Sequence, residues 1–156
     1  YAQRSDLPRF AGWWGHDKRI RFAMGPHFSA IEGAEGWQLS NPPILPLSAM
    51  CASMEIFDEA GMKELRAKSV ALTGFLEFLL DQVPSRKFSM ITPRDPHQRG
   101  WQLSIQVKEE GKQLYEYLTR HGVVCDWRAP DVIRVAPVPL YNSFMDVYRF
   151  VEILVS

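Results

Sequence analysis

The 156-residue sequence is poor in the features that mark several classes of protein. Its 18 lysines and arginines balance 18 aspartates and glutamates, so no basic excess indicates binding to nucleic acid or to an anionic membrane surface. No apolar run approaches the roughly 20 residues that a membrane-spanning helix needs. The sequence therefore predicts neither a nucleic-acid partner nor a membrane partner.

Cysteine is also scarce. The two cysteines, Cys51 and Cys125, are far apart and lie in apolar stretches, whereas a disulfide framework or a zinc site needs more numerous or more closely spaced ligands. The four histidines are scattered without the spacing of a metal site. We therefore predict no metal, and two reduced, buried thiols in a cytoplasmic protein.

The common catalytic motifs are missing as well. The sequence contains no G-x-S-x-G elbow, no phosphate-binding P-loop and no dinucleotide-binding glycine fingerprint. No pair of carboxylates stands out as a general acid and base. We predict binding residues but no catalytic nucleophile, and a start at Tyr1 without an initiator methionine leads us to expect part of a longer protein.

The chain divides by its patterning into two regions. Residues 1–46 show no sustained periodicity and are rich in glycine, proline and aromatic residues. So long a stretch without regular structure is unusual inside a compact domain, so we expect it to cross another part of a larger protein or to carry a site. Residues 47–156 show the periodic patterns of a small domain.

The periodic region predicts helices and strands in the order α, α, β, β, α, β, β, α. The first helix ends at Gly61 and the second before Pro84, and Asn142 or Ser143 caps the last. Alternation in "WQLSIQV" predicts a half-buried strand. Two apolar stripes mark the core faces of the second and last helices: Leu72, Phe75, Leu76, Leu79, Val83, and Phe144, Val147, Val151, Leu154. We predict an α+β fold with a mostly antiparallel sheet and its helices on one face.

The stretch "AGWWGHDKRIRFAM" concentrates residues that can bind a ligand. The indoles of Trp13 and Trp14 offer flat faces and N–H donors, and His16 can donate or titrate. The glycines at positions 12 and 15 let the backbone approach a neighbour closely. The cluster suits a planar or anionic ligand, and the alternative is an aromatic plug or a docking surface for a partner domain.

Two further residues are candidates for binding. Arg134 lies in the short apolar strand "VIRVAP", where an arginine usually has a fixed carboxylate partner. That partner is a protein carboxylate or a ligand carboxylate, and the residues alone favour the former. Asn41 precedes two prolines that favour an extended backbone, so its amide can bond a ligand oxygen or, as is commoner, the local turn.

Several of these segments together resemble kynureninase, a pyridoxal-phosphate (PLP) enzyme. They include "GWWGHDKRIRFAM", "LSNPPIL", "RGWQLSI" and "IRVAPVPLYNSF", and they follow the family's order from Gly12 to the C-terminus. The resemblance implies the C-terminal third of a fold type I enzyme. Residues 1–46 would then cross the missing large domain and the interface of a homodimer, and residues 47–156 would form the small C-terminal domain.

The resemblance also implies roles for individual residues. Trp13 would contact the PLP phosphate, and Asn41 would lie at the cofactor near the aryl end of the substrate. His16 would lie near the aromatic ring of the substrate, and Arg134 would bind its α-carboxylate. Trp14 would serve packing only. The lysine that binds PLP covalently in this family would lie upstream, so no catalytic residue is assigned here and this chain alone is expected to be inactive.

For the whole enzyme, the resemblance implies hydrolysis of L-kynurenine or 3-hydroxy-L-kynurenine to anthranilate or 3-hydroxyanthranilate and L-alanine. This reaction belongs to tryptophan catabolism and NAD biosynthesis. Two alternatives remain from the residues themselves. One is a non-catalytic α+β ligand-binding domain with Arg134 as an anion anchor. The other is a docking module whose paired tryptophans cover a partner.

Overall fold

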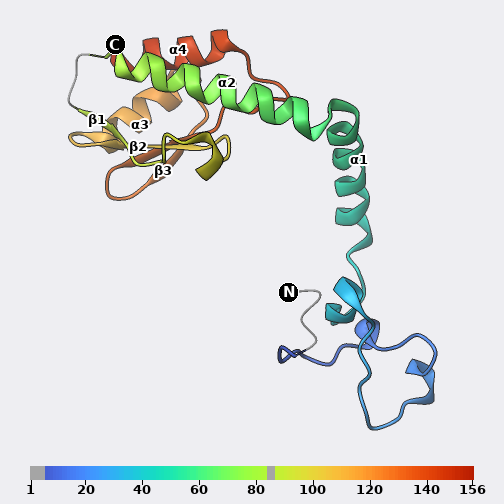
Figure 1. The fold of residues 1–156 in the computed structure, drawn as a ribbon. Coiled ribbons are helices and arrows are strands. Elements are labelled where there is room, and N and C mark those ends of the chain that lie inside the picture. Colours follow the sequence, from blue (N-terminus) through green and yellow to red (C-terminus); the bar gives the residue numbers. More distant parts are fainter. Residues whose placement is uncertain (1–5, 84–86) are drawn as a thin grey trace. The chain divides into compact units, whose positions relative to one another are not determined.

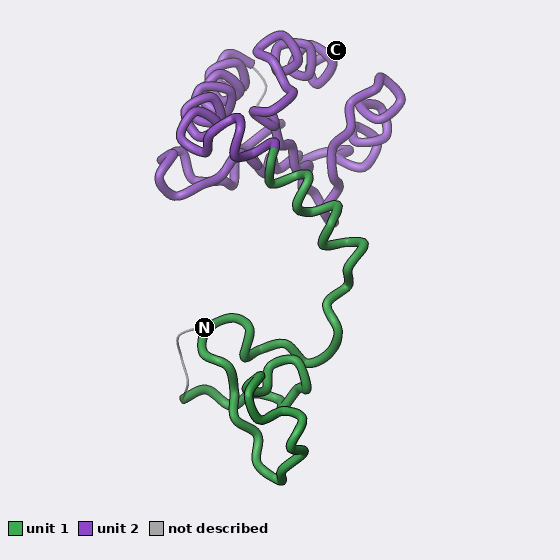
Figure 2. Tube along the Cα trace, turned by 90° about the vertical axis from the view of Figure 1, so that its right-hand side faces the viewer, with its two compact units in different colours: residues 1–55 green, residues 56–156 purple. Residues whose placement is uncertain are grey.

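The computed structural model of the chain describes residues 6–83 and 87–156. The chain forms two compact units, Tyr1–Glu55 and Ile56–Ser156 (Figure 2). The division falls within the first long helix, α1 (Ile44–Ala60). The boundary that we placed between residues 46 and 47 stays a prediction, and it lies close to the point where this helix begins.

Before α1, the described part of the first unit (residues 6–43) has little regular structure, which agrees with the lack of periodicity in the sequence there. It contains three short 3-10 helices, η1 (Trp13–Gly15), η2 (Arg21–Ala23) and η3 (Gly33–Trp37). An isolated antiparallel bridge between His16 and Ala30 joins the segments around η1 and η3. The unit is therefore held by a few backbone contacts and by side chains, which are described below with the site.

Helices α1 and α2 (Met62–Asp81) meet at Gly61, as predicted. Gly61 has a φ of +78°, a conformation that favours glycine and ends α1. The predicted stripe faces the core: Leu72 and Leu76 of α2 are fully buried, and the other three residues of the stripe, of which Val83 lies just beyond α2, pack against the core. Pro84, our predicted helix end, lies outside the described residues, and α2 ends at Asp81.

In the described part of the second unit, four strands form one antiparallel sheet (Figure 1). The order β1-β2-β4-β3 confirms the mostly antiparallel sheet that the hairpin-like spacing predicted. The bounds of the strands are β1 Phe88–Met90, β2 Leu103–Val107, β3 Asp126–Arg128 and β4 Val132–Val135. A turn containing a cis Ala129–Pro130 peptide joins β3 to β4, where "APD" predicted a turn.

The register of the two central strands separates a buried face from an open one. Ile105 pairs with Ile133 and Leu103 pairs with Val135, and all four side chains are buried. The intervening pair, Ser104 and Arg134, points to the opposite face because side chains alternate along a strand. Arg134 therefore lies on the open face of the sheet, away from the core.

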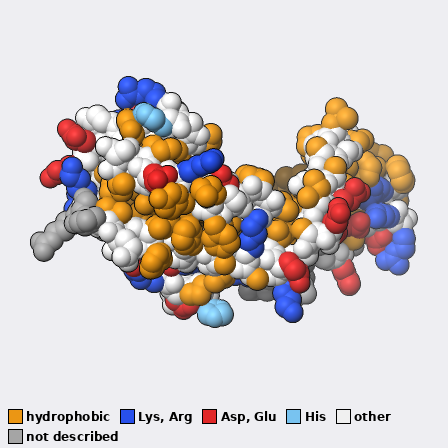
Figure 3. Space-filling view, turned by 90° about the horizontal axis from the view of Figure 1, so that it is seen from above, with side chains coloured by type: hydrophobic (Ala, Val, Ile, Leu, Met, Phe, Trp, Pro, Cys, Tyr) orange, Lys and Arg blue, Asp and Glu red, His pale blue; other side chains and the backbone are white. Residues whose placement is uncertain are grey.

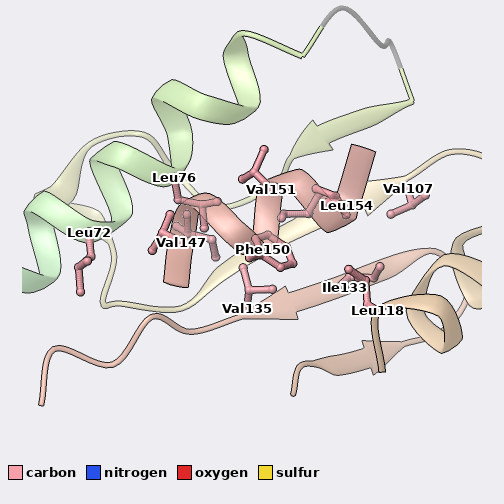
Figure 4. Close-up of a cluster of buried hydrophobic side chains, with 12 residues drawn as sticks. Leu72, Leu76, Val107, Leu118, Ile133, Val135, Val147, Phe150, Val151 and Leu154 are labelled. Atoms are coloured by element: carbon pink, nitrogen blue, oxygen red, sulfur yellow. The ribbon is translucent and has the colours of Figure 1, made fainter. Parts of the chain in front are cut away.

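Helices α2, α3 (Gly111–Arg120) and α4 (Phe144–Val155) place apolar side chains against the buried face (Figure 4). Ser143 caps α4 and forms a capping box with Asp146, which settles the cap that the sequence left open between two residues. Among the described residues, the main core cluster consists of twelve buried residues: Leu72, Leu76, Leu103, Ile105, Val107, Leu118, Ile133, Val135, Val147, Phe150, Val151, Leu154.

Our prediction of the buried stripe of α4 is wrong for one residue. Phe144 is 47% exposed, whereas Phe150, which we did not include, is buried. Phe144 lies in the first turn of α4 and contacts Phe75 edge to face, with 5.6 Å between the ring centroids. A helical stripe with a period of 3.6 residues includes both phenylalanines within its width, so spacing alone does not separate them.

Helix α1 buries none of its residues. Its exposed apolar side chains include Leu45, Met50 and Met54. Figure 3 shows that hydrophobic side chains, drawn in orange, cover much of the visible surface of the chain. Cys51 belongs to α1 and is exposed, so our prediction of a buried thiol is wrong at this position. Cys125 is partly buried. Neither cysteine is in a disulfide.

Two kinds of feature are absent from the described residues. No helix among them is both long enough and apolar enough to cross a bilayer. No group of three or more histidine, cysteine, aspartate or glutamate side chains within 6–83 and 87–156 is placed to hold a metal ion.

Candidate functional site

The turn around η1 packs directly against the chain segment that ends η3. The N–H of Gly15 donates to the carbonyl oxygen of Gln38 at 2.9 Å. A Cβ atom at Gly12 would lie 2.4 Å from the same oxygen, and one at Gly15 would lie 2.9 Å from it. The close approach that we predicted from these glycines is therefore to the protein's own backbone, and it brings the segment before Asn41 against the tryptophans.

Trp14 and Asn41 are joined by a side-chain hydrogen bond. The indole N–H of Trp14 donates to the Oδ1 atom of Asn41. Packing is thus not the sole contribution of Trp14, contrary to our expectation. Because Oδ1 accepts this bond, the Nδ2 amide group of Asn41, an exposed residue, is the part that can donate to a ligand.

Trp13 presents its indole differently. Its side chain is 42% exposed and packs edge to face on Phe22, with ring centroids 5.5 Å apart. Among the described residues, none accepts a hydrogen bond from its indole N–H. An exposed indole donor of this kind can serve an anionic oxygen, which is what the predicted phosphate contact requires.

His16 is held by a backbone donor and a neighbouring ring. The N–H of Ser29 donates to Nδ1 of His16 at 3.0 Å. The imidazole stacks on Phe28 with 5.4 Å between centroids and 27° between planes. Because a backbone N–H can only donate, Nδ1 is an acceptor, and the neutral ring carries its proton on Nε2. His16 therefore offers an Nε2–H donor.

Arg21 is a residue of this region that sequence reasoning missed. It is 6% exposed, and its Nη2 donates to the carbonyl oxygens of Trp14 at 3.1 Å and His16 at 2.9 Å. Its guanidinium carbon lies 5.4 Å from the centroid of the Trp14 ring. Arg21 thus holds both ends of the turn that carries the cluster.

The neighbouring basic residues Lys18 and Arg19 are exposed and form ion pairs, unlike the buried Arg21. Arg19 pairs with Asp17 at 2.7 Å, and Lys18 pairs with Glu35 at 3.1 Å. Hydrogen bonds from Arg19 lower the pKa of Asp17 to about 2. In the sequence "DKRIRF" nothing distinguishes the buried arginine from these exposed ones, because all belong to one basic run.

In the second unit, Arg134 has a protein carboxylate as its partner. Asp126 on β3 lies directly across from Arg134 on β4. The Nε of Arg134 donates to Oδ2 of Asp126 at 2.8 Å, and its Nη2 donates to the same oxygen. This is the partner that the residues alone favoured. The role of Arg134 in binding a ligand carboxylate stays a prediction. Its side chain is 29% exposed and so remains accessible to a ligand.

A pocket of about 490 Å³ in the second unit lies elsewhere. It lies between α4 and the end of β4, and its lining includes Val124, Pro137, Tyr141 and Phe150. None of the predicted site residues lines it, so we assign it no role in the site.

The predicted residues thus fall into two groups. Trp13, His16 and Asn41 belong to the first unit, where the η1 turn and its bond to Asn41 bring them together. Arg134 belongs to the second unit. The arrangement offers donors for anionic oxygens in both units: indole, amide and imidazole groups in one, and a guanidinium group in the other.

Comparison with solved structures first defines the class of fold. A mutant of C-DES with glycine covalently linked to the PLP cofactor matches 96% of this chain and 38% of its own, with a TM-score of 0.70 and 16% identity. The apo cysteine desulfurase of Thermococcus onnurineus NA1 matches 94% of this chain and 38% of its own, with a TM-score of 0.70 and 15% identity. The chain therefore has the fold of a part of the fold type I PLP enzymes, as predicted.

Comparison of sequences then gives the family. The model of the kynureninase C-terminal domain matches residues 65–154, and the chain belongs to this family. The curated kynureninase of Koribacter versatilis is 60% identical over 156 residues, which are 100% of this chain and 37% of that protein. The kynureninase of Myxococcus xanthus is 61% identical over 154 residues, 99% of this chain and 36% of its own. The chain spans little more than a third of these relatives.

Proposed function

We propose that this chain is the C-terminal part of a kynureninase. The whole enzyme would hydrolyse L-kynurenine or 3-hydroxy-L-kynurenine to anthranilate or 3-hydroxyanthranilate and L-alanine. The observation that carries this proposal is the 60% identity along the entire chain to the kynureninase of Koribacter versatilis. The reaction would place the enzyme in tryptophan catabolism and NAD biosynthesis, in the cytoplasm.

The cofactor in this proposal is PLP, which supplies an electron sink for bond cleavage at the substrate when it is bound. The donors of the first unit fit it. Trp13 would donate its exposed indole N–H to the phosphate, and Asn41 would donate from the amide group that its bond to Trp14 leaves available.

Arg134 would bind the α-carboxylate of the substrate. A guanidinium group binds a carboxylate through two parallel hydrogen bonds, which fixes direction as well as distance. Arg134 is anchored in the sheet by its strand and by Asp126, so a carboxylate bound to it is held in one orientation. A carboxylate held in this way fixes the position of the substrate relative to the rest of the site.

His16 would contact the aromatic end of the substrate. Its neutral tautomer presents an Nε2–H donor, and its ring is braced by Phe28. A polar group that bonds a substrate hydroxyl rejects the analogue lacking it more strongly than an apolar wall does. His16, together with Asn41, would therefore contribute to the choice between kynurenine and its 3-hydroxy form.

The chain would act only together with the rest of the enzyme. None of its lysines matches the family's covalent PLP-binding lysine, so the 156 residues alone would not catalyse. The remaining large domain would complete the site, and the whole protein would form a homodimer. The exposed apolar side chains of α1, among them Leu45 and Met54, suit burial against such neighbours.

Purified full-length protein tests the proposal directly. With PLP present, it should release anthranilate from L-kynurenine, followed by the product's fluorescence, and the isolated 156-residue chain should release none. An authentic kynureninase serves as the positive control. If the full-length protein binds PLP and leaves both kynurenines intact while the control turns them over, the proposal is wrong and a non-catalytic role is favoured.

A further inference from the structure

We propose that Asp126 is a positioning residue for Arg134. It binds one edge of the guanidinium group and thereby turns the other edge toward the carboxylate of the ligand. This inference rests on the proposed function for the nature of that ligand. It assigns a role to a residue that no motif in the sequence indicates.

The argument begins with the two edges of a guanidinium group. The side edge carries Nε–H and one Nη2–H, and the end edge carries N–H groups of Nη1 and Nη2. In Arg134 both donors of the side edge bind Oδ2 of Asp126, with Nε at 2.8 Å. Among the described residues none accepts a hydrogen bond from Nη1, so the end edge is available for a bidentate carboxylate.

The sheet explains why this pairing is fixed. Asp126 and Arg134 are direct partners across the antiparallel strands β3 and β4, and both side chains point to the open face. Side chains of such pairs have Cβ atoms about 5 Å apart, within reach of one another. The strand pairing therefore sets the position of the carboxylate, and the carboxylate sets the rotation of the guanidinium.

The charge balance leaves Arg134 attractive to an anion. Arg128 also contacts Asp126, with its Nε 3.1 Å from the same Oδ2 atom. Two guanidinium groups thus share a single carboxylate, and this group of three has a net charge of +1. Asp126 orients Arg134 without cancelling the positive charge that a ligand carboxylate needs.

The competing interpretation is that Asp126 blocks Arg134. A carboxylate already bound to the arginine could occupy the place of the ligand, and its removal would then strengthen binding. The observed contacts favour positioning, because Asp126 takes the side edge through one oxygen atom and leaves the end edge unoccupied by described groups. The two interpretations predict opposite changes in affinity.

The test uses the full-length holoenzyme with Asp126→Ala and Asp126→Asn. We expect Asp126→Ala to raise KM for kynurenine about tenfold, with kcat changed less than about twofold, since the charge of Arg134 is kept and its orientation is lost. Asp126→Asn should raise KM about threefold, because the amide oxygen still accepts a hydrogen bond. Absorbance of bound PLP should match the wild type, and the unfolding temperature should fall by no more than a few degrees, because the ion pair is partly exposed.

Asp81→Ala is the matched control. Asp81 is 49% exposed, close to the 47% of Asp126, and it also pairs with an arginine, Arg94, at 2.6 Å. Its loss should leave KM and kcat within about twofold, as for an exposed ion pair of small energetic value. A KM change equal to that of Asp126→Ala would show a general effect of surface charge and overturn the proposal.

A double-mutant cycle supplies the decisive comparison. In an Arg134→Ala background, Asp126→Ala should change kcat/KM less than twofold, because the positioned group is gone. An equal loss in both backgrounds, an unchanged KM or a lowered KM for Asp126→Ala would overturn the positioning role. Wild-type enzyme that leaves kynurenine intact would instead overturn the proposed function, and the positioning of substrate with it.

Discussion

The indole N–H of Trp14 donates to the side-chain oxygen of Asn41, 27 residues further along the chain. This bond connects the η1 turn to the segment that leads into α1. It also gives the two neighbouring tryptophans different roles. Trp14 orients an amide within the protein, while the indole N–H of Trp13 has no described acceptor and is available to a ligand.

Trp14→Phe tests this division, since phenylalanine keeps an aromatic ring near Arg21 while the smaller ring lacks the N–H donor. We expect PLP to bind the full-length apoenzyme about fivefold more weakly, the effect of losing about 1 kcal/mol from one hydrogen bond that orients Asn41. Absorbance during PLP titration measures this. In an Asn41→Ala background the same substitution should have no further effect, and a full additional loss there would contradict the role given to Trp14.

The close approach at Gly12 predicts a large and local effect of a single methyl group. In Gly12→Ala the new Cβ would meet the Cα of Leu39 at 2.3 Å and the carbonyl oxygen of Gln38 at 2.4 Å. Backbone atoms on both sides must move, so we expect a loss of about 1–3 kcal/mol in unfolding free energy. Urea unfolding followed by tryptophan fluorescence measures it in the 156-residue chain.

Gly25→Ala is the control for Gly12→Ala. A Cβ at Gly25 has nothing within 4 Å, so its effect should stay within about 0.5 kcal/mol. Equal stability of the two variants would show that the packing of residues 12–15 against 36–39 does not hold the unit together.

Arg21 gives a prediction about stability at a buried charge. Arg21→Ala leaves the carbonyl oxygens of Trp14 and His16 without this donor and removes a buried side chain, so we expect a loss of about 1–3 kcal/mol in unfolding free energy. Arg19→Ala is the matched control, because that side chain is 86% exposed and its removal should have only a small effect on stability. Denaturant unfolding compares the two, and similar losses would refute the bracing role of Arg21.

The fold was largely predictable because its signals are local. Alternation in β2 places Leu103, Ile105 and Val107 on the buried face, as expected. Ser143 was one of two expected caps, and a glycine ends α1 where the sequence predicted it. Each of these features depends on residues within one turn or one strand, which sequence spacing reveals directly.

The site was less predictable because its contacts are distant in sequence. The bond between Trp14 and Asn41 and the burial of Arg21 depend on how loops without periodicity pack, and no spacing rule describes that. The partner of Arg134 could be expected as a carboxylate, but its identity as Asp126 follows from strand register. The family resemblance supplied the roles of Trp13, His16, Asn41 and Arg134, which stay predictions.

The pair of Asp126 and Arg134 predicts a dependence on pH. Hydrogen bonding to the Arg134 guanidinium, with a further contribution from Arg128, holds the pKa of Asp126 below its ordinary value of 3.8. Because the pKa is lowered in the folded state, the pair stabilises the fold above pH 3.8, and this stabilisation is lost as the pH falls through the lowered pKa.

Carboxyl carbon NMR of the 156-residue chain can follow the titration of Asp126. In Arg134→Ala we expect its pKa to rise toward 3.8 but to stay below it, since Arg128 remains. An Asp126 pKa that is the same in both proteins would show that the arginine does not hold the carboxylate in solution.

Trp13 and Arg134 should separate cofactor binding from substrate binding in the full-length enzyme. Trp13→Phe removes the indole donor proposed for the phosphate, so PLP should dissociate about tenfold more readily while KM, measured with saturating PLP, changes little. Arg134→Ala removes the group proposed for the α-carboxylate. It should lower kcat/KM at least a hundredfold, as expected for a charged pair whose loss costs about 3 kcal/mol or more, with PLP retention unchanged. Equilibrium dialysis of PLP and steady-state kinetics measure the two properties independently. Loss of PLP from the Arg134 variant, with kynurenine affinity intact, would reverse the roles that we assign.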